Sequence, residues 1–319
     1  MPKVSIITAA YNHVRFIRQS VESAQGQTYR DFEHIVVDDG SSDGTADVLK
    51  SFGDQITYIR QENRGAHAAI NRGIRRSSGE YIAILDSDDA WLPNKLERQM
   101  QAFEEHPEAG LVYAQAYIVD DEGHFINNGE PGGKPFANPQ RAFHELLREN
   151  CIPVLTAVFR RACIEQVGFF NEALKATSDW DMWIRIAAKW PIIFVSDALA
   201  LYRIHENSTW QALMKTGRVN KEHLLILENA AAAFPASTAE GIKSRENIGA
   251  IFRHTAVRTG YGLWYRHQYS KAIGYLLFAL RLHPMLLKDA LFALRLRFIA
   301  KLILGERGTK IFGDMKRIF

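Results

Sequence analysis

The first part of the chain alternates between short apolar runs and stretches in which apolar residues recur at helical spacing. The helical spacing is clear at 17–25, where Ile17, Val21 and Ala24 share one face, and again at 66–76. Strand and helix alternating at this interval predict a mostly parallel sheet with helices on both faces. The expected strands occupy residues 4–10, 32–37, 56–60 and 81–85.

The same patterns predict further elements along the chain. A helix from about Trp91 to Glu105 has a proline early in its first turn, where proline is tolerated. Strands are expected at 111–119 and 154–159. Residues 120–139 are rich in Gly, Asn and Pro and predict a long surface loop. Long loops in compact domains are either functional lids or disordered, and of these two we favour a lid over an acceptor site.

From about residue 213 onward the pattern is helical. The expected helices are 213–233, 242–258, 263–282 and 285–304. The predicted fold class is therefore α/β. Residues 1–212 would form a domain around a mostly parallel sheet, and residues 213–319 a helical region.

Polar residues cluster directly after each of the first four strands. These clusters are Tyr11, Asp38-Asp39, Asn63-Arg64 and Asp86–Asp89. Because ligands bind beyond the carboxyl ends of parallel strands, we expect the clusters to converge on one edge of the sheet. Simpler interpretations stay open: the Asp38-Asp39 pair as turn or cap residues, Tyr11 as a core aromatic, and Arg64 as a surface arginine.

The densest cluster is Asp86-Ser87-Asp88-Asp89, which places three carboxylates within four positions at the end of a buried strand. Burying that much negative charge is costly unless a positive charge lies nearby. Hard cations such as Mg²⁺ are commonly held by one or two carboxylates together with substrate phosphates. The stretch predicts an Asp-x-Asp metal–diphosphate site, and a solvated acidic turn is the alternative.

Four stretches together resemble the family-2 glycosyltransferases of the GT-A fold. They are VSIITAAYN (4–12), VDDGSSDGT (37–45), NRG (63–65) and GEYIAILDSDD (79–89), and the resemblance covers roughly residues 3–210. It implies inverting transfer from a nucleotide-diphosphate sugar, usually a UDP-sugar, with Mg²⁺ or Mn²⁺ as cofactor. By position it places Ala9 and Tyr11 beside the base, Asp39 at the uracil N–H, Arg64 near the nucleotide or its phosphates, Asp86 near the ribose and donor sugar, and Asp88 on the metal.

A second chemical stretch is SDWDMWIR (178–185). On a helix, Asp181 and Arg185 lie one turn apart and could pair, and Asp179 could be a cap or first-turn acid. The stretch is similar to the family motif Glu-Asp-x-x-Leu-x-x-Arg, which implies Asp179 as the catalytic base, with Asp181 as the alternative. Ser178 stands where the motif has Glu, a departure that bears on donor and acceptor placement. An inverting transfer needs such a base to take the proton of the attacking hydroxyl.

His205 lies in the stretch YRIHENS (202–208), which ends this domain. A lone histidine is more often a packing or surface residue than a ligand. In the GT-A fold, however, a histidine at this late position often reaches the metal or the diphosphate. The resemblance therefore implies His205 as a second metal ligand beside Asp88.

Composition indicates a soluble globular protein, with 47% hydrophobic and 24% charged residues among 319. The only cysteines, Cys151 and Cys163, provide no disulfide framework and indicate a reducing compartment. Met1-Pro2-Lys3 leads straight into the first strand without a secretory signal. We therefore expect a cytoplasmic protein.

The charges are divided unevenly along the chain. Residues 243–319 carry 15 Lys and Arg against 4 Asp and Glu, a balance of +11, while residues 1–242 have a balance of −8. The expected helix 285–304 has two apolar stripes with Arg295, Arg297 and Lys301 among them. It could pack in a helical bundle or lie on the inner face of an anionic membrane. We find no nucleic-acid recognition motif.

The interpretation that accounts for most of these features is a metal-dependent inverting glycosyltransferase in cell-surface polysaccharide or glycolipid assembly. Its partners would be a nucleotide-sugar donor and a saccharide or lipid-linked acceptor. A nucleotidyltransferase would need a Gly- and Lys-rich phosphate loop near the first strand, and none is present. A non-catalytic sugar-nucleotide-binding subunit would be expected to lack Asp88 or Asp179, and the sequence has both.

Overall fold

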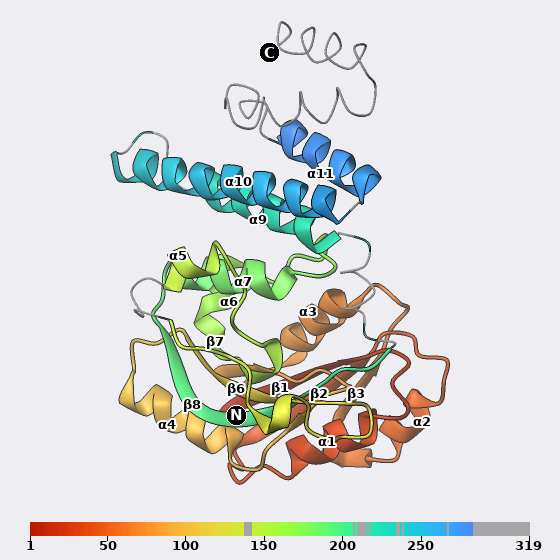
Figure 1. The fold of residues 1–319 in the computed structure, drawn as a ribbon. Helices are drawn as coiled ribbons and strands as arrows, with labels where there is room; N and C mark the ends of the chain where they lie inside the picture. The colour runs from red at the N-terminus through yellow and green to blue at the C-terminus, as the bar shows by residue number, and fades with distance from the viewer. Residues whose placement is uncertain are drawn as a thin grey trace, which may run out of the picture. The chain divides into compact units, whose positions relative to one another are not determined.

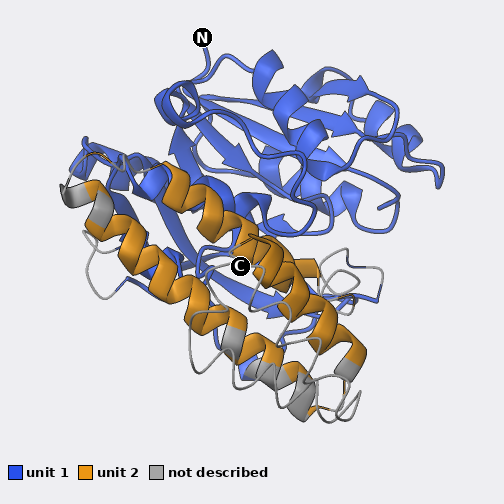
Figure 2. Ribbon diagram, turned by 90° about the horizontal axis from the view of Figure 1, so that it is seen from above, with its two compact units in different colours: residues 1–211 blue, residues 212–319 orange. Residues whose placement is uncertain are grey.

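The computed structural model describes residues 1–136, 142–206, 208, 216, 218–233, 237, 239–266 and 268–282. The chain divides into two compact units, residues 1–211 and 212–319 (Figure 2).

The described part of unit 1 contains an eight-stranded sheet whose first half is parallel. The four predicted N-terminal strands lie in the order β3-β2-β1-β4. Helices α1 and α2 cover one face of this half and α3 covers the other (Figure 1). Gly73 of α3 allows close packing, because a Cβ there would lie 2.6 Å from Ile7 Cγ2. The bounds are β1 Val4–Ala10, α1 Ile17–Gln25, β2 Phe32–Asp38, α2 Thr45–Lys50, β3 Thr57–Arg60, α3 Ala66–Arg76 and β4 Tyr81–Ile84.

The second half of the sheet continues from β4 in the order β7-β6-β8-β5. β6 and β8 pair in parallel, while β7 and β5 pair antiparallel with their neighbours. The sequence pattern did not single out β8, whose apolar run is interrupted by Ser196 and Asp197. The register with β6 shifts at that point. The bounds are β5 Ala90–Trp91, α4 Lys95–Glu105, β6 Leu111–Val119, α5 Ala142–Leu146, β7 Val158–Arg160, α6 Arg161–Val167, α7 Ser178–Ala187 and β8 Ile192–Arg203.

Two predicted boundaries were wrong. The expected strand at 154–159 begins as a 3₁₀ turn over Val154–Thr156, and pairing starts only at Val158. Side chains bind the carbonyls that a strand would use: Trp91 Nε1 donates to the Leu155 oxygen at 2.8 Å. The helix expected from Trp91 begins at Lys95, because Ala90 and Trp91 pair with β8 instead.

The segment after β6 packs back along that strand as far as it is described. Ile126 donates its N–H to the Ile118 oxygen at 2.8 Å, and Gly132 and Ala116 exchange two backbone bonds. β7 pairs with only the first two residues of β6, so this segment takes up the edge that β7 leaves open. The lid role stays a prediction, and residues 137–139 lie outside the described residues.

The described part of unit 2 contains three helices, α9 Arg218–Ala232, α10 Ala239–Tyr265 and α11 Tyr269–Leu282, and α10 packs against the other two. The predicted break near 258–263 was wrong, because α10 continues through Gly260. A Cβ on Gly260 would lie 2.6 Å from Leu276 Cδ2, so this glycine lets α11 approach. The expected helix 285–304 lies outside the described residues. None of the described helices is both long enough and apolar enough to span a bilayer.

Candidate active site

Side chains tie the loop after β1 to the loop after β2. Asn12, with a φ of 53°, donates its N–H to Ser41 Oγ at 3.0 Å, and its Oδ1 accepts from the Ser42 N–H at 2.8 Å. The next N–H, that of His13, donates to Thr45 Oγ1 at 3.0 Å. The positive φ of Asn12 is a left-handed conformation, which asparagine tolerates better than most residues do. The two loops therefore form one rigid wall at the carboxyl edge of the sheet.

Asp39 extends this wall to the loop after β3. Its buried carboxylate accepts from Gln61 Nε2 at 2.7 Å and from the backbone N–H groups of Arg64 at 2.9 Å and Gly65 at 2.7 Å. Gly40 follows in the left-handed region with a φ of +82°, and a Cβ there would lie 3.1 Å from the Asn63 nitrogen. Asp39 thus positions the loop that leads into α3. Its role toward a base stays a prediction.

The other residues predicted to bind the nucleotide lie at or near the surface of this edge. Tyr11 is 47% exposed, which rules out the core-aromatic interpretation, and Ala9 beside it is partly buried. The Arg64 side chain is 70% exposed, and its Nη2 lies 3.7 Å from Glu172 Oε2. The side chains of Tyr11 and Arg64 are thus available to a ligand.

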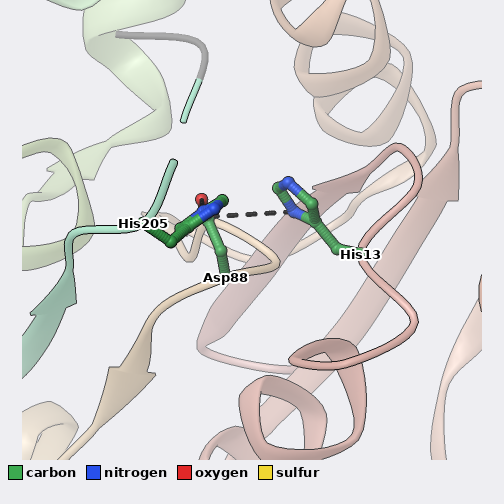
Figure 3. Close-up of side chains that lie close together, drawn as sticks. All are labelled: His13, Asp88 and His205. Atoms are coloured by element: carbon green, nitrogen blue, oxygen red, sulfur yellow. Dashed lines mark hydrogen bonds and ion pairs between the residues drawn. The ribbon is translucent and has the colours of Figure 1, made fainter. Parts of the chain in front are cut away.

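His13, Asp88 and His205 come together from three separate loops (Figure 3). His205 Nε2 lies 3.0 Å from Asp88 Oδ2, and His13 Nδ1 lies 3.9 Å from Asp88 Oδ1. One ligand atom from each residue falls within 4.8 Å of the other two. The structure thus brings the predicted pair Asp88 and His205 together and adds His13. Two imidazoles and a carboxylate suit a divalent cation.

Asp179 and Asp181 have different environments on α7. Asp181 is buried and forms an ion pair with Arg185, whose Nη2 lies 2.8 Å away. Arg185 also donates to the backbone oxygens of 167–169. Among the described residues no cation pairs with Asp179, whose carboxylate accepts hydrogen bonds from Asn150 Nδ2 at 2.9 Å and from the Trp180 N–H. The Asp181–Arg185 pairing predicted from helical spacing is therefore confirmed, and it ties α7 to the chain before it.

Residues 5–168 match the sequence family described as Glycosyl transferase family 2. The chain belongs to glycosyl transferase family 2. It is therefore a glycosyltransferase, which removes the nucleotidyltransferase alternative.

Relatives of this family-2 glycosyltransferase cover most of its length. An uncharacterized glycosyltransferase of Rickettsia prowazekii is 30% identical over 269 residues, which span 77% of this chain and 82% of the relative. TuaG of Bacillus subtilis, named as a teichuronic acid biosynthesis glycosyltransferase, is 31% identical over 232 residues, which span 69% of this chain and 88% of TuaG.

Solved structures share the GT-A fold of this glycosyltransferase. S. aureus TarS residues 1–349 in complex with UDP-GlcNAc match with a TM-score of 0.66 at 17% identity, covering 99% of this chain and 91% of TarS 1–349. A mannosyltransferase from Pyrobaculum calidifontis in complex with GDP-Man and Mn²⁺ matches with a TM-score of 0.55 at 19% identity, covering 87% and 86% of the two chains. The predicted fold class is confirmed.

The acidic groups of this glycosyltransferase perturb one another. Burial, then the charges of Asp88 and Asp179, raise the pKa of Asp86 to about 7. Burial also raises the pKa of Asp179 to about 6, although hydrogen bonds from the Trp180 N–H and from Asn150 oppose that shift. Burial would raise the pKa of Asp88 too, but the hydrogen bond with His205 and the charge of His13 lower it. The site thus contains both ionised and readily protonated carboxyls.

Sequence reasoning missed three residues of this site: His13, Asn150 and Arg203. His13 directly follows the first motif, so its position after a strand was a usable signal. Arg203 is 3% exposed. It donates from Nε to the backbone carbonyl oxygen of Asp88 and from Nη1 to that of Asp120, each at 2.9 Å. Its partners are mainly backbone carbonyls, which no sequence pattern marks.

Proposed function

We propose that this glycosyltransferase transfers a sugar, with inversion, from a nucleotide-diphosphate sugar to a hydroxyl of a saccharide or lipid-linked acceptor, and that it requires Mg²⁺ or Mn²⁺. The observation that carries the proposal is the Asp88–His205 pair. Asp88 and Asp179 both lie near enough to Asp86 for their charges to raise its pKa. The 3.0 Å between the ligand atoms of the pair is about the separation of two neighbouring ligands on one cation.

The donor would lie along the carboxyl edge of the sheet. Ala9 and the exposed ring of Tyr11 would flank the base, Asp39 would accept from the base N–H, and Arg64 would approach the phosphates. Asp86 would face the ribose and donor sugar, and Asp88 with His205 would hold the cation. Bound there, a divalent cation would neutralise the charge that develops on the departing diphosphate.

Asp179 is the proposed catalytic base. It would take the proton of the acceptor hydroxyl as that oxygen attacks the anomeric carbon. A pKa of about 6 leaves Asp179 ionised at pH 7 and makes it a stronger base than an ordinary aspartate. Asp181 is less suitable, because Arg185 occupies its carboxylate. Ser178 stands where the motif has Glu, so the carboxylate that the motif places beside the base is absent here.

We further propose a UDP-sugar of the hexosyl or N-acetylhexosaminyl type as donor, and a role in cell-surface polysaccharide synthesis. The UDP-GlcNAc in the TarS complex supports the donor class, and the name of TuaG supports the pathway class. We also propose that the protein works at the cytoplasmic face of the membrane, held by its basic C-terminal region.

The test is calorimetric titration of the full chain with UDP, GDP and dTDP, each with and without Mn²⁺, followed by donor-hydrolysis assays. We expect one nucleotide to bind more tightly with Mn²⁺ and Asp88→Ala to lose that gain. Asp179→Asn should bind the nucleotide as well as the unmodified protein, with turnover reduced by about 10²–10⁴-fold.

Asp181→Asn is the matched control for Asp179→Asn, because both remove one charge from the first turn of α7. If Asp181→Asn abolished turnover while keeping its thermal unfolding temperature, and Asp179→Asn did not, the base would be Asp181. Nucleotide binding without turnover in the unmodified protein, under every donor and acceptor tried, would favour a non-catalytic sugar-nucleotide-binding subunit.

A further inference from the structure

His13 lies beside the proposed metal pair but came from no sequence motif. It sits in the loop between β1 and α1, whereas Asp88 follows β4 and His205 follows β8. Its ring meets the His205 ring edge-on, with centroids 5.7 Å apart. In Figure 3 the His13 ring points toward Asp88 and His205 from the opposite side of the cluster.

The position of the His13 ring is held from several directions. Its backbone N–H donates to Thr45 Oγ1, and its Nδ1 lies 2.7 Å from Ser87 Oγ. The ring of Phe16 packs against both imidazoles, with centroids 6.2 Å from His13 and 4.9 Å from His205. The side chain is only 20% exposed. These contacts keep the His13 imidazole near the metal pair, so it loses little further freedom on binding a ligand.

The distances fit a shared cation. Neighbouring ligands on a six-coordinate ion with bonds of about 2.1 Å lie about 3 Å apart. Asp88 and His205 already have that separation, at 3.0 Å. The 3.9 Å from His13 Nδ1 to Asp88 Oδ1 exceeds that separation by less than about 1 Å. A side-chain rotation would close this gap, and Nδ1 would exchange its hydrogen bond with Ser87 Oγ for the cation.

We propose that His13 is a third protein ligand of the metal, and that the set of two imidazoles and one carboxylate makes the site prefer Mn²⁺ to Mg²⁺. The inference rests on the proposed function. Mg²⁺ takes oxygen ligands and keeps several of its waters, whereas first-row transition ions accept imidazole nitrogen readily. An Asp-x-Asp site with only carboxylate and phosphate ligands would lack this preference.

The experiment is pulsed electron paramagnetic resonance of Mn²⁺ on the full chain, with and without UDP. Imidazole nitrogens bound directly to Mn²⁺ produce characteristic ¹⁴N couplings. We expect two such couplings in the unmodified protein, one each in His13→Gln and His205→Gln, and none in the double variant. Mn²⁺ affinity of His13→Gln should fall about 10-fold or more, and Mg²⁺ affinity should change less.

The matched control is His124→Gln. His124 is exposed. With Asp120 and Glu122 it forms the other group of described His and acidic residues whose ligand atoms lie close enough together to hold a metal ion. Its removal should leave both couplings unchanged. His13→Asn serves as a second variant, and thermal unfolding checks that each protein is folded.

The outcomes separate this inference from the proposed function. A single coupling that disappears in His205→Gln and persists in His13→Gln would leave the metal site standing and show that His13 is not a ligand. A coupling to His13 that appears only with UDP would still support the inference, with the nucleotide completing the site. Mn²⁺ binding unaffected by Asp88→Ala would overturn the proposed function itself.

Discussion

At the scale of single residues, Asp179 is the group whose environment bears most directly on catalysis. Burial raises its pKa to about 6, and the hydrogen bond from Asn150 holds that pKa below the value burial alone would produce. A base must be deprotonated to work, so its active form is lost as the pH falls through its pKa. The rate should therefore decline on the acid side, near pH 6 rather than near pH 4.

We expect kcat for donor turnover to show this acid limb near pH 6, and Asn150→Ala to move it to higher pH. Without the Asn150 amide, the ionised carboxylate loses a donor and binds its proton more tightly. The measurement is the pH dependence of kcat for both proteins between pH 5 and 8. A lower plateau with an unmoved limb would mean that Asn150 serves the fold but does not tune Asp179.

The pKa of Asp86 is raised as well, but Asn150 does not bind this carboxyl. Its pKa of about 7 reflects burial first and then the charges of Asp88 and Asp179. Removing Asn150 should change the pKa of Asp86 only indirectly, because Asn150 donates its hydrogen bond to Asp179. The direction of the limb's movement in Asn150→Ala therefore reports on Asp179.

At the scale of elements, Arg203 connects segments that are far apart in sequence. Arg203 is the last residue of β8. Its guanidinium donates to the backbone carbonyl oxygens of Asp88 and Asp120 and to Gln19 Oε1 of α1, the last at 2.7 Å. Its own N–H donates to Asp89 Oδ1 at 2.8 Å. This one side chain fixes the loop that carries Asp88 relative to the strand that leads to His205.

We expect Arg203→Lys to lower the free energy of unfolding by about 2–4 kcal/mol, because an ammonium group cannot reproduce the planar fork of donors. Mn²⁺ affinity should fall by a larger factor than metal-free UDP affinity, since Asp88 and His205 lose their alignment. Urea unfolding and Mn²⁺ titration measure the two effects.

Arg98→Lys is the control for the arginine-to-lysine change. Arg98 is 42% exposed, and its Nη2 lies 3.1 Å from Asp197 Oδ2, so its replacement should change stability by less than about 0.5 kcal/mol. If Arg203→Lys lost stability but bound Mn²⁺ normally, Arg203 would support the fold without positioning the metal ligands.

The elements also show how far sequence alone reaches. The parallel strands β1, β2 and β4 were predictable because each is a short apolar run that ends in polar residues. β8 was not, because Ser196 and Asp197 interrupt its apolar run at the bulge. Asp88 could be predicted as a metal ligand from the Asp-x-Asp motif, and His205 from its position late in the domain. Arg203 could not be predicted, because it acts through backbone carbonyls that only the fold brings together.

At the scale of the whole molecule, the two units differ in charge. The balance of +11 lies in residues 243–319, within unit 2, and the remainder of the chain carries −8. On α11 of unit 2, Leu277 is 50% exposed. Basic charge together with an exposed apolar side chain such as Leu277 suits the surface of an anionic membrane. Lipid-linked acceptors would be found at such a surface.

We expect the full chain to co-sediment with vesicles containing phosphatidylglycerol but not with pure phosphatidylcholine vesicles, and the bound fraction to fall as salt is raised. The triple variant Arg295→Gln, Arg297→Gln, Lys301→Gln removes three of the basic residues near the C-terminus. At about 1 kcal/mol for each basic residue near the surface, it should weaken binding on the order of 100-fold.

The matched control removes three exposed positive charges from unit 1 through Arg18→Gln, Lys50→Gln and Arg98→Gln. Both triple variants lower the net charge equally, so a purely global electrostatic attraction would weaken both alike. A local docking surface in unit 2 would weaken only the first. Equal loss in the two variants, or binding that ignores salt, would exclude the C-terminal region as the membrane contact and favour packing against a protein partner.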